Sequence, residues 1–86
     1  MYRVETASRK VEKEIVSLEK PVRERVMVAL GELAEEPRPL GSRKLSGKMK
    51  GAWRIRVGDF RVLYDIHDDE QIVVILAVLH RRDAYR

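Results

Sequence analysis

The sequence predicts an α+β fold in which an αα-hairpin packs on one face of an antiparallel β-sheet. Three observations lead to this prediction. Two segments in the first half of the chain, residues 7–20 and 21–36, carry apolar residues at helical spacing. Residues 53–67 alternate between apolar and polar side chains around a turn, which is typical of a β-hairpin. Residues 72–79 are all apolar and rich in β-branched side chains, which indicates a further strand.

The elements before the hairpin follow from local signals. Residues 1–4 are expected to form a short N-terminal strand. The apolar residues of the first helix recur at intervals of four, four and three, and Thr6 or Ser8 can cap it. This helix should end before Pro21, because the residue before a proline disfavours helical geometry, and Pro21 suits the first turn of the second helix. The connection is very short, so the helices should form a hairpin.

The β-hairpin is expected to turn at Gly58-Asp59, which is a two-residue turn signal. In that register Arg56 faces Arg61 across the two strands. Directly opposite residues share a face of the sheet, so one apolar face should lie under the helices, formed by Trp53, Ile55, Val57, Phe60, Val62 and Tyr64.

The last strand and the long connection complete the predicted fold. Residues 72–79 have no polar face, so we expect a central strand that is buried on both faces and ends a C-terminal meander. Residues 37–51 are expected to form a loop, which Leu40, Leu45 and Met49 would anchor on the core.

Length and composition exclude several classes of protein. The length of 86 residues predicts one domain, residues 1–86. The chain has no cysteine, which excludes a disulfide framework, a thiol nucleophile and a cysteine-based zinc site. The N-terminus lacks the apolar region of a signal peptide, and the longest apolar run is too short to cross a bilayer. We therefore expect a cytoplasmic protein that does not associate with membranes.

Positive charge is concentrated in two parts of the chain. Charged residues make up 37% of the sequence, and the formal net charge is +4. Residues 43–56 are rich in lysine and arginine and contain no acid, and the C-terminal tail is also basic. Such segregation predicts an anionic partner, and nucleic acid is the leading candidate. The loop and tail residues expected to bind RNA are Lys44, Lys48, Lys50 and Arg82.

The hairpin register gathers three arginines on the face opposite the helices: Arg54, Arg56 and Arg61. Like charges directly opposite each other on neighbouring strands are unfavourable. Guanidinium groups match phosphate oxygens bidentately, so we favour a phosphate-binding cradle. The alternative is an ordinary solvated sheet face whose arginines pair with acids.

His80 and Tyr85 are the candidates for proton transfer, because they follow closely on the last strand. The alternatives are an exposed histidine and a tyrosine that packs the tail. No motif for a metal, a nucleotide cofactor or a hydrolase nucleophile is present, so we expect no cofactor and no metal. A nuclease that uses the RNA 2′-hydroxyl as its nucleophile fits these residues, because that reaction needs neutralisation of the phosphate, a base and an acid.

Two segments resemble the RelE/ParE superfamily of bacterial and archaeal type II toxins: residues 53–64, WRIRVGDFRVLY, and residues 78–85, VLHRRDAY. Residues 45–47, LSG, are similar to that family's Leu-x-Gly element. The resemblance covers essentially the whole chain. It implies a RelE-like, microbial-ribonuclease-like fold and a neutralising antitoxin as partner. The catalytic residues that it implies are Arg54, Arg56, Arg61, His80, Arg81 and Tyr85.

For RelE-type members the resemblance implies cleavage of mRNA in the ribosomal A site, with ribosome and mRNA as partners. We therefore expect a ribosome-dependent, metal-independent endoribonuclease that inhibits translation. The alternative is a ParE-type toxin that binds and poisons DNA gyrase without nuclease activity. A third possibility is a basic structural or regulatory protein with no activity of its own. The fold alone does not separate these functions.

Overall fold

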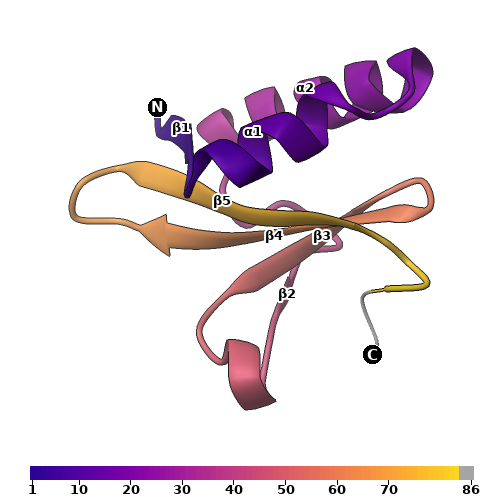
Figure 1. Ribbon diagram of the computed structural model, residues 1–86. Helices are drawn as coiled ribbons and strands as arrows, with labels where there is room; N and C mark the ends of the chain where they lie inside the picture. The colour runs from indigo at the N-terminus through magenta and orange to yellow at the C-terminus, as the bar shows by residue number, and fades with distance from the viewer. Residues whose placement is uncertain (84–86) are drawn as a thin grey trace.

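In the computed structural model, which describes residues 1–83, two α-helices cover one face of a five-stranded sheet (Figure 1). The elements in chain order are β1 (Arg3–Thr6), α1 (Arg9–Val16), α2 (Lys20–Glu35), β2 (Arg43–Lys44), the 3₁₀ helix η1 (Gly47–Met49), β3 (Trp53–Val57), β4 (Phe60–His67) and β5 (Ile72–His80). The strand order across the sheet is β1-β5-β4-β3-β2. The predicted α+β fold, with both helices on one face of the sheet, is confirmed.

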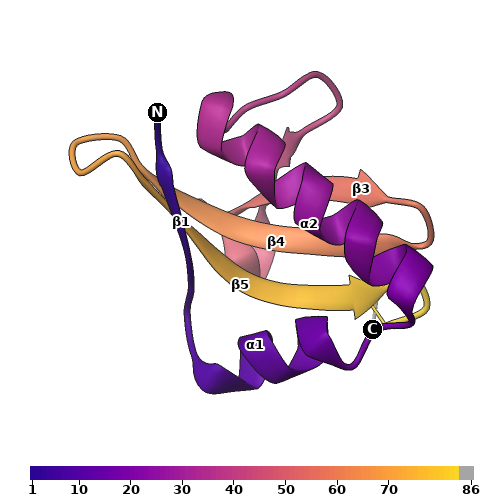
Figure 2. The same cartoon turned by 90° about the horizontal axis from the view of Figure 1, so that it is seen from above.

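The N-terminal strand closes the sheet on the side of the last strand. β1 pairs with β5 and runs parallel to it, whereas the other pairings are antiparallel, so the sheet is mixed. Seen from above, α1 lies along β5 and α2 crosses over β4 and β3 (Figure 2). Neither of these two helices is both long and apolar enough to cross a membrane.

The helix boundaries have identifiable local causes. The Ser8 side chain caps α1 by accepting a hydrogen bond from the Val11 backbone N–H at 3.5 Å. α1 is shorter than predicted, because it ends at Val16 and Leu18 packs on the core from the connection instead. Pro21 lies in the first turn of α2, as predicted, where its missing N–H costs no helical hydrogen bond.

The core lies between the helices and the covered face of the sheet. The helices contribute the predicted apolar stripes, and β3, β4 and β5 contribute alternate residues. The largest side chains with essentially no exposed surface are Tyr64, Leu33, Ile75, Val26, Val62 and Val73. Fully burying one apolar side chain contributes roughly 1.5–3 kcal/mol to stability. This packing holds the apolar side of the hairpin against the helices and leaves its other side uncovered.

The hairpin has the predicted register. Val57 faces Phe60 and Arg56 faces Arg61. The backbone φ angle is positive at Gly58, at 59°, and not at the next residue, which is the pattern of a type II′ turn. A Cβ atom at Gly58 would also lie 3.1 Å from the Arg25 guanidinium, so glycine suits this position for two reasons.

β5 differs from the prediction in two respects. It lies next to the middle of the sheet, where β4 is the central strand. Only one of its faces is fully buried, through Val73, Ile75 and Val78, while the other face is half-buried because no helix covers it. One extra residue in β5, Leu76, has no partner on β4 and forms a β-bulge.

The connection between α2 and β3 is more ordered than the predicted loop. It contains β2, which pairs with the start of β3, and η1. Leu45 is half-buried, but Leu40 and Met49 are exposed, so the prediction that all three anchor the loop is wrong. Backbone hydrogen bonds, rather than apolar contacts, hold this segment: the Leu45 N–H donates to the Ala52 carbonyl at 2.8 Å.

A polar cluster clamps the end of the sheet farthest from the hairpin turn. The Arg38 guanidinium binds the Asp68 carboxylate through two hydrogen bonds of 3.2 and 2.8 Å, and the Tyr2 hydroxyl donates to the same carboxylate. The Arg38 guanidinium also lies 5.3 Å from the Trp53 ring centroid. Beneath it, the Tyr64 hydroxyl donates to the Pro37 carbonyl at 2.8 Å. These contacts fix where the chain leaves α2 and heads toward β2.

The Asp68 clamp makes stability depend on pH. Hydrogen bonds from Arg38 and then Tyr2 lower the pKa of Asp68 from 3.8 to about 2. A lowered pKa in the folded state stabilises the fold above the unfolded pKa, and this stabilisation is lost as the pH falls from about 4 to about 2. Asp68→Asn should therefore lower the melting temperature at pH 7 and flatten its fall between pH 4 and pH 2. Asp69→Asn, in the same turn, should follow the wild type, and identical profiles for wild type and Asp68→Asn would contradict the prediction.

The Tyr64 hydroxyl supports the loop from inside the core. Burial raises the pKa of Tyr64 to about 12, so the hydroxyl remains a hydrogen-bond donor at neutral pH. Tyr64→Phe fills the same space but leaves the Pro37 carbonyl without this donor, and we expect a loss of about 1–2 kcal/mol in the free energy of unfolding. Urea denaturation measures this loss. The exposed Val28→Ala control should change stability by less than about 0.5 kcal/mol, and an equal effect of both substitutions would argue against the prediction.

Candidate nucleic-acid interface

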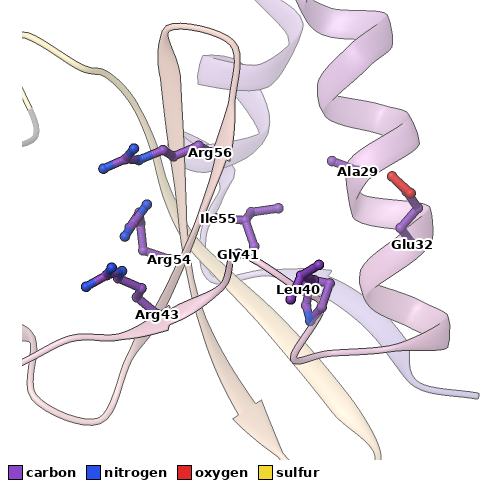
Figure 3. Close-up of a pocket in the computed structure, with 9 residues that line it drawn as sticks. Ala29, Glu32, Leu40, Gly41, Arg43, Arg54, Ile55 and Arg56 are labelled. Carbon is purple, nitrogen blue, oxygen red and sulfur yellow. The ribbon is translucent and has the colours of Figure 1, made fainter.

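Four arginines lie on the sheet face opposite the helices, and we call them the arginine face: Arg43, Arg54, Arg56 and Arg61. Arg43 faces Arg54 across β2 and β3, and Arg56 faces Arg61 across β3 and β4. Arg54 and Arg56 are two residues apart on β3, so all four side chains share one face. In Figure 3 the side chains of Arg43, Arg54 and Arg56 project together on one side of β3, whereas Ile55 points to the other side.

Arg61 combines burial with incomplete hydrogen bonding. It is only 8% exposed, and its Nη1 donates to the Phe60 carbonyl at 3.2 Å. In the part of the chain that the structure describes, the buried Nε has no hydrogen-bond partner, and no ion pair involves Arg61. Burying a cationic donor without a partner costs free energy. This arrangement therefore favours the binding of an anion.

The register places arginines where like charges are closest. In a two-residue hairpin the pair beside the turn is hydrogen-bonded, so the next pair, Arg56 and Arg61, is of the non-hydrogen-bonded type with the shorter separation. Like charges opposite each other cost roughly 0.2–1 kcal/mol. Arg43 and Arg54 form a second pair of directly opposed arginines, of the hydrogen-bonded type with the wider separation. Two adjacent pairs of opposed arginines concentrate positive potential over β3.

A hollow of about 480 Å³ lies beside the arginine face, between α2 and the edge of β3. Arg43, Arg54 and Arg56 line it from the sheet, and Glu32 lines it from α2. Figure 3 shows the Glu32 carboxylate on the opposite side of β3 from the guanidinium groups. The hollow therefore leaves space next to the arginines, and the Glu32 carboxylate that lines it lies across β3 from their guanidinium groups.

The structure does not bring His80 to the arginine face. His80 faces Phe60 on the helix-covered side of the sheet, and the two rings meet edge to face with centroids 5.2 Å apart. The cause is the bulge at Leu76, which shifts the alternation of β5 by one residue, so that Leu79 faces Arg61 instead. The His80 Nδ1 accepts a hydrogen bond from the Arg82 backbone N–H at 3.2 Å.

The described part of the tail lies near the hairpin turn. The Arg81 backbone N–H donates to the Asp59 carbonyl at 2.7 Å, and its Nε lies 3.9 Å from an Asp59 carboxylate oxygen. Both side chains are mostly exposed, so this ion pair contributes little stability. Arg82 is exposed, and Tyr85 lies outside the described residues.

The basic residues of the connection are distributed differently from the expectation. Lys44 faces Trp53 and therefore lies on the side of the sheet opposite the arginine face. Lys48 lies in η1 and Lys50 follows it, and both are exposed. Arg43 was not singled out by the sequence, because a strand of two residues has no alternation pattern. Its position became evident only from the pairing of β2 with β3.

The chemistry available on the arginine face is binding and charge stabilisation. Guanidinium groups stay protonated, so they neutralise phosphate oxygens but do not act as bases. Aimed at a phosphate, they stabilise charge that develops in a transition state. Among residues 1–83, no group of three or more His, Asp or Glu side chains is placed to hold a metal ion.

Residues 4–85 match the family model described as the ParE toxin of the type II toxin-antitoxin system parDE. The chain is also 43% identical over 61 residues to the toxin RelG of Mycobacterium tuberculosis, a match that covers 71% of this chain and 69% of that protein.

The chain is also similar to chains in solved toxin-antitoxin structures. The archaeal RelE–RelB complex from Pyrococcus horikoshii OT3 contains a chain with a TM-score of 0.82 and 31% identity, covering 96% of this chain and 98% of that one. A chain of the RelBE2 toxin-antitoxin complex from Mycobacterium tuberculosis gives a TM-score of 0.81 and 31% identity. That match covers 95% of this chain and 93% of the other. The family model is named after ParE, whereas these individual relatives are named after RelE or RelG. Sequence and fold together place this chain in the RelE/ParE superfamily of type II toxins.

Proposed function

We propose that this toxin is a ribosome-dependent mRNA endoribonuclease that inhibits translation. The observation that carries the proposal is Arg61, a buried guanidinium with an unpartnered Nε that stands directly opposite Arg56. Such an arrangement lowers stability, and an anionic ligand would supply the missing hydrogen-bond acceptor and the opposite charge. The RelE and RelG names of its relatives point in the same direction.

In the proposed reaction the 2′-hydroxyl of the RNA attacks the adjacent phosphate and displaces the 5′-oxygen of the next nucleotide. Arg56 and Arg61 would bind the scissile phosphate and stabilise the negative charge that develops on its oxygens. Arg81, at the end of β5, and Tyr85, in the tail, remain candidates for contacts with the RNA and for the proton transfers. His80 packs on Phe60 on the other side of the sheet, so we assign it no step.

The second candidate function is that of a ParE-type toxin that poisons DNA gyrase. The name of the matching family model favours it. Binding to another protein needs neither opposed arginines nor an unpartnered buried guanidinium, so the arginine face favours the nuclease. The two proposals share the fold and differ in what the arginines are for.

The proposed partners follow from the same comparisons. The similar chains from Pyrococcus horikoshii and Mycobacterium tuberculosis occur in toxin-antitoxin complexes, and we propose that this chain likewise binds a cognate antitoxin. A protein that acts on translating ribosomes works in the cytoplasm. We propose that residues 1–86 form one toxin domain.

Primer extension on an mRNA in a purified translation system, with and without ribosomes, tests the nuclease. We expect cuts within codons only when ribosomes are present. Arg61→Gln should lower the cleavage rate by about 100-fold or more, because a donor to the transition state is lost. The melting temperature of Arg61→Gln should equal or exceed that of the wild type, because a buried cation with no acid partner is removed.

Arg3→Gln, in β1 at the opposite edge of the sheet from β2, is the matched control and should cleave like the wild type. Wild-type cleavage by the double variant Arg56→Gln/Arg61→Gln would refute the proposed role of these arginines. Intact mRNA in both conditions, from protein that stops growth when induced, would refute the nuclease. A gyrase cleavage-complex assay would then test the second candidate.

A further inference from the structure

We propose that Arg43 and Arg54 form a second phosphate subsite, next to the one at Arg56 and Arg61, for a single-stranded RNA. The inference rests on the proposed binding of RNA at the arginine face and assigns Arg43 a role that the sequence did not suggest. The two pairs lie in adjacent rows of the sheet, because Arg54 and Arg56 are two residues apart on β3. At ~3.3 Å per residue the rows are roughly 7 Å apart, which matches successive phosphates of one extended strand.

The position of Arg43 is well defined for an exposed residue. Backbone hydrogen bonds hold the chain on both sides of β2, from the Ser42 N–H to the Pro39 carbonyl at 3.0 Å and from the Leu45 N–H to the Ala52 carbonyl at 2.8 Å. The polar clamp at Arg38 fixes the start of the same segment. The Arg43 guanidinium is therefore presented beside Arg54 by a supported strand and not by a free loop.

Within the described part of the chain, the Arg43 side chain has no acidic partner. None of the ion pairs within residues 1–83 includes Arg43, and it stands opposite another arginine. Charged residues on an edge strand also protect a sheet from pairing with other sheets, which is the competing explanation for β2. Lys44, the other residue of β2, would serve that purpose equally well but lies on the opposite face.

Lys44→Gln is thus a matched control for Arg43→Gln. Both variants remove one positive charge from the same two-residue strand, but from opposite faces of the sheet. The probe is a 2′-O-methyl oligoribonucleotide, which has no free 2′-hydroxyl and cannot be cleaved. Its dissociation constant is measured by fluorescence anisotropy over a series of KCl concentrations.

Arg43→Gln is expected to weaken binding by about three- to tenfold and to reduce the slope of log affinity against log salt by about 0.7, the value for one phosphate contact with a single strand. Arg43→Lys should keep the slope, because the charge remains. Lys44→Gln should leave the slope unchanged. Arg43→Glu should weaken binding more than Arg43→Gln does, whereas Lys44→Glu should have a much smaller effect than Arg43→Glu. Equal effects at the two positions, or no binding by the wild type at low salt, would overturn the inference.

A second measurement tests whether the two pairs bind neighbouring phosphates. By NMR titration, the gain in affinity from a dinucleotide to a trinucleotide reports the contribution of the second phosphate. Arg43→Gln should reduce this gain by about threefold, whereas an undiminished gain would contradict the second subsite.

These measurements involve no cleavage and no ribosome, so they are separate from the test of the proposed function. If the wild type leaves mRNA intact but Arg43→Gln reduces the slope of log affinity against log salt, the subsite is upheld and the nuclease is refuted. Cleavage of mRNA by a protein in which Arg43 and Lys44 behave alike would uphold the nuclease and refute the subsite.

Discussion

The two-residue turn at Gly58-Asp59 is the constraint on which the rest of this molecule depends. It sets the pairing of β3 with β4, and this pairing decides which side chains lie under the helices. A shift of one residue would place the apolar side chains in water and the arginines in the core. The positive φ of Gly58 makes the turn, and the adjacent Arg25 guanidinium leaves little room for a side chain there.

The two faces of the hairpin obey different physical rules. Under the helices, packing is dense and the buried Tyr64 hydroxyl has a hydrogen-bond partner. On the other face, arginines oppose arginines and the buried Arg61 Nε has no partner in the described chain. Each of these features lowers stability, and all of them lie together. Local violations of packing and charge rules that gather at one place are typical of a functional site, because the remainder of the fold compensates for them.

The parts of the fold that follow from regular side-chain patterns were predictable. The hairpin register, the start of the second helix and the side of the sheet that the helices cover came from alternation, proline and apolar spacing. The features that depend on backbone pairing were not. β2 has only two residues, so it shows no alternation that would place Arg43 on the arginine face. The bulge at Leu76 lies in an all-apolar run, where one residue more or less leaves no trace in the sequence.

That bulge explains why the candidate site was predicted in part only. Counting residues along a regular strand would put His80 on the same face as Arg61, whereas the extra residue puts Leu79 there. The three hairpin arginines were placed correctly because their strands are regular up to the turn. An extra residue in a strand moves every later side chain to the other face of the sheet. Alternation alone therefore assigns the wrong face to the residues of β5 after Leu76.

The parallel pairing of β1 with β5 links the first residues of the chain to the last strand. Synthesis proceeds from the N-terminus, so β1 emerges early and has no partner until residues 72–80 have followed it. Contacts between such distant segments form late in folding, because a long loop must close first. The sheet that supports the arginines is thus completed only when residues 72–80 are available. For a protein proposed to attack translating ribosomes, this order of assembly delays activity until this strand has been synthesised.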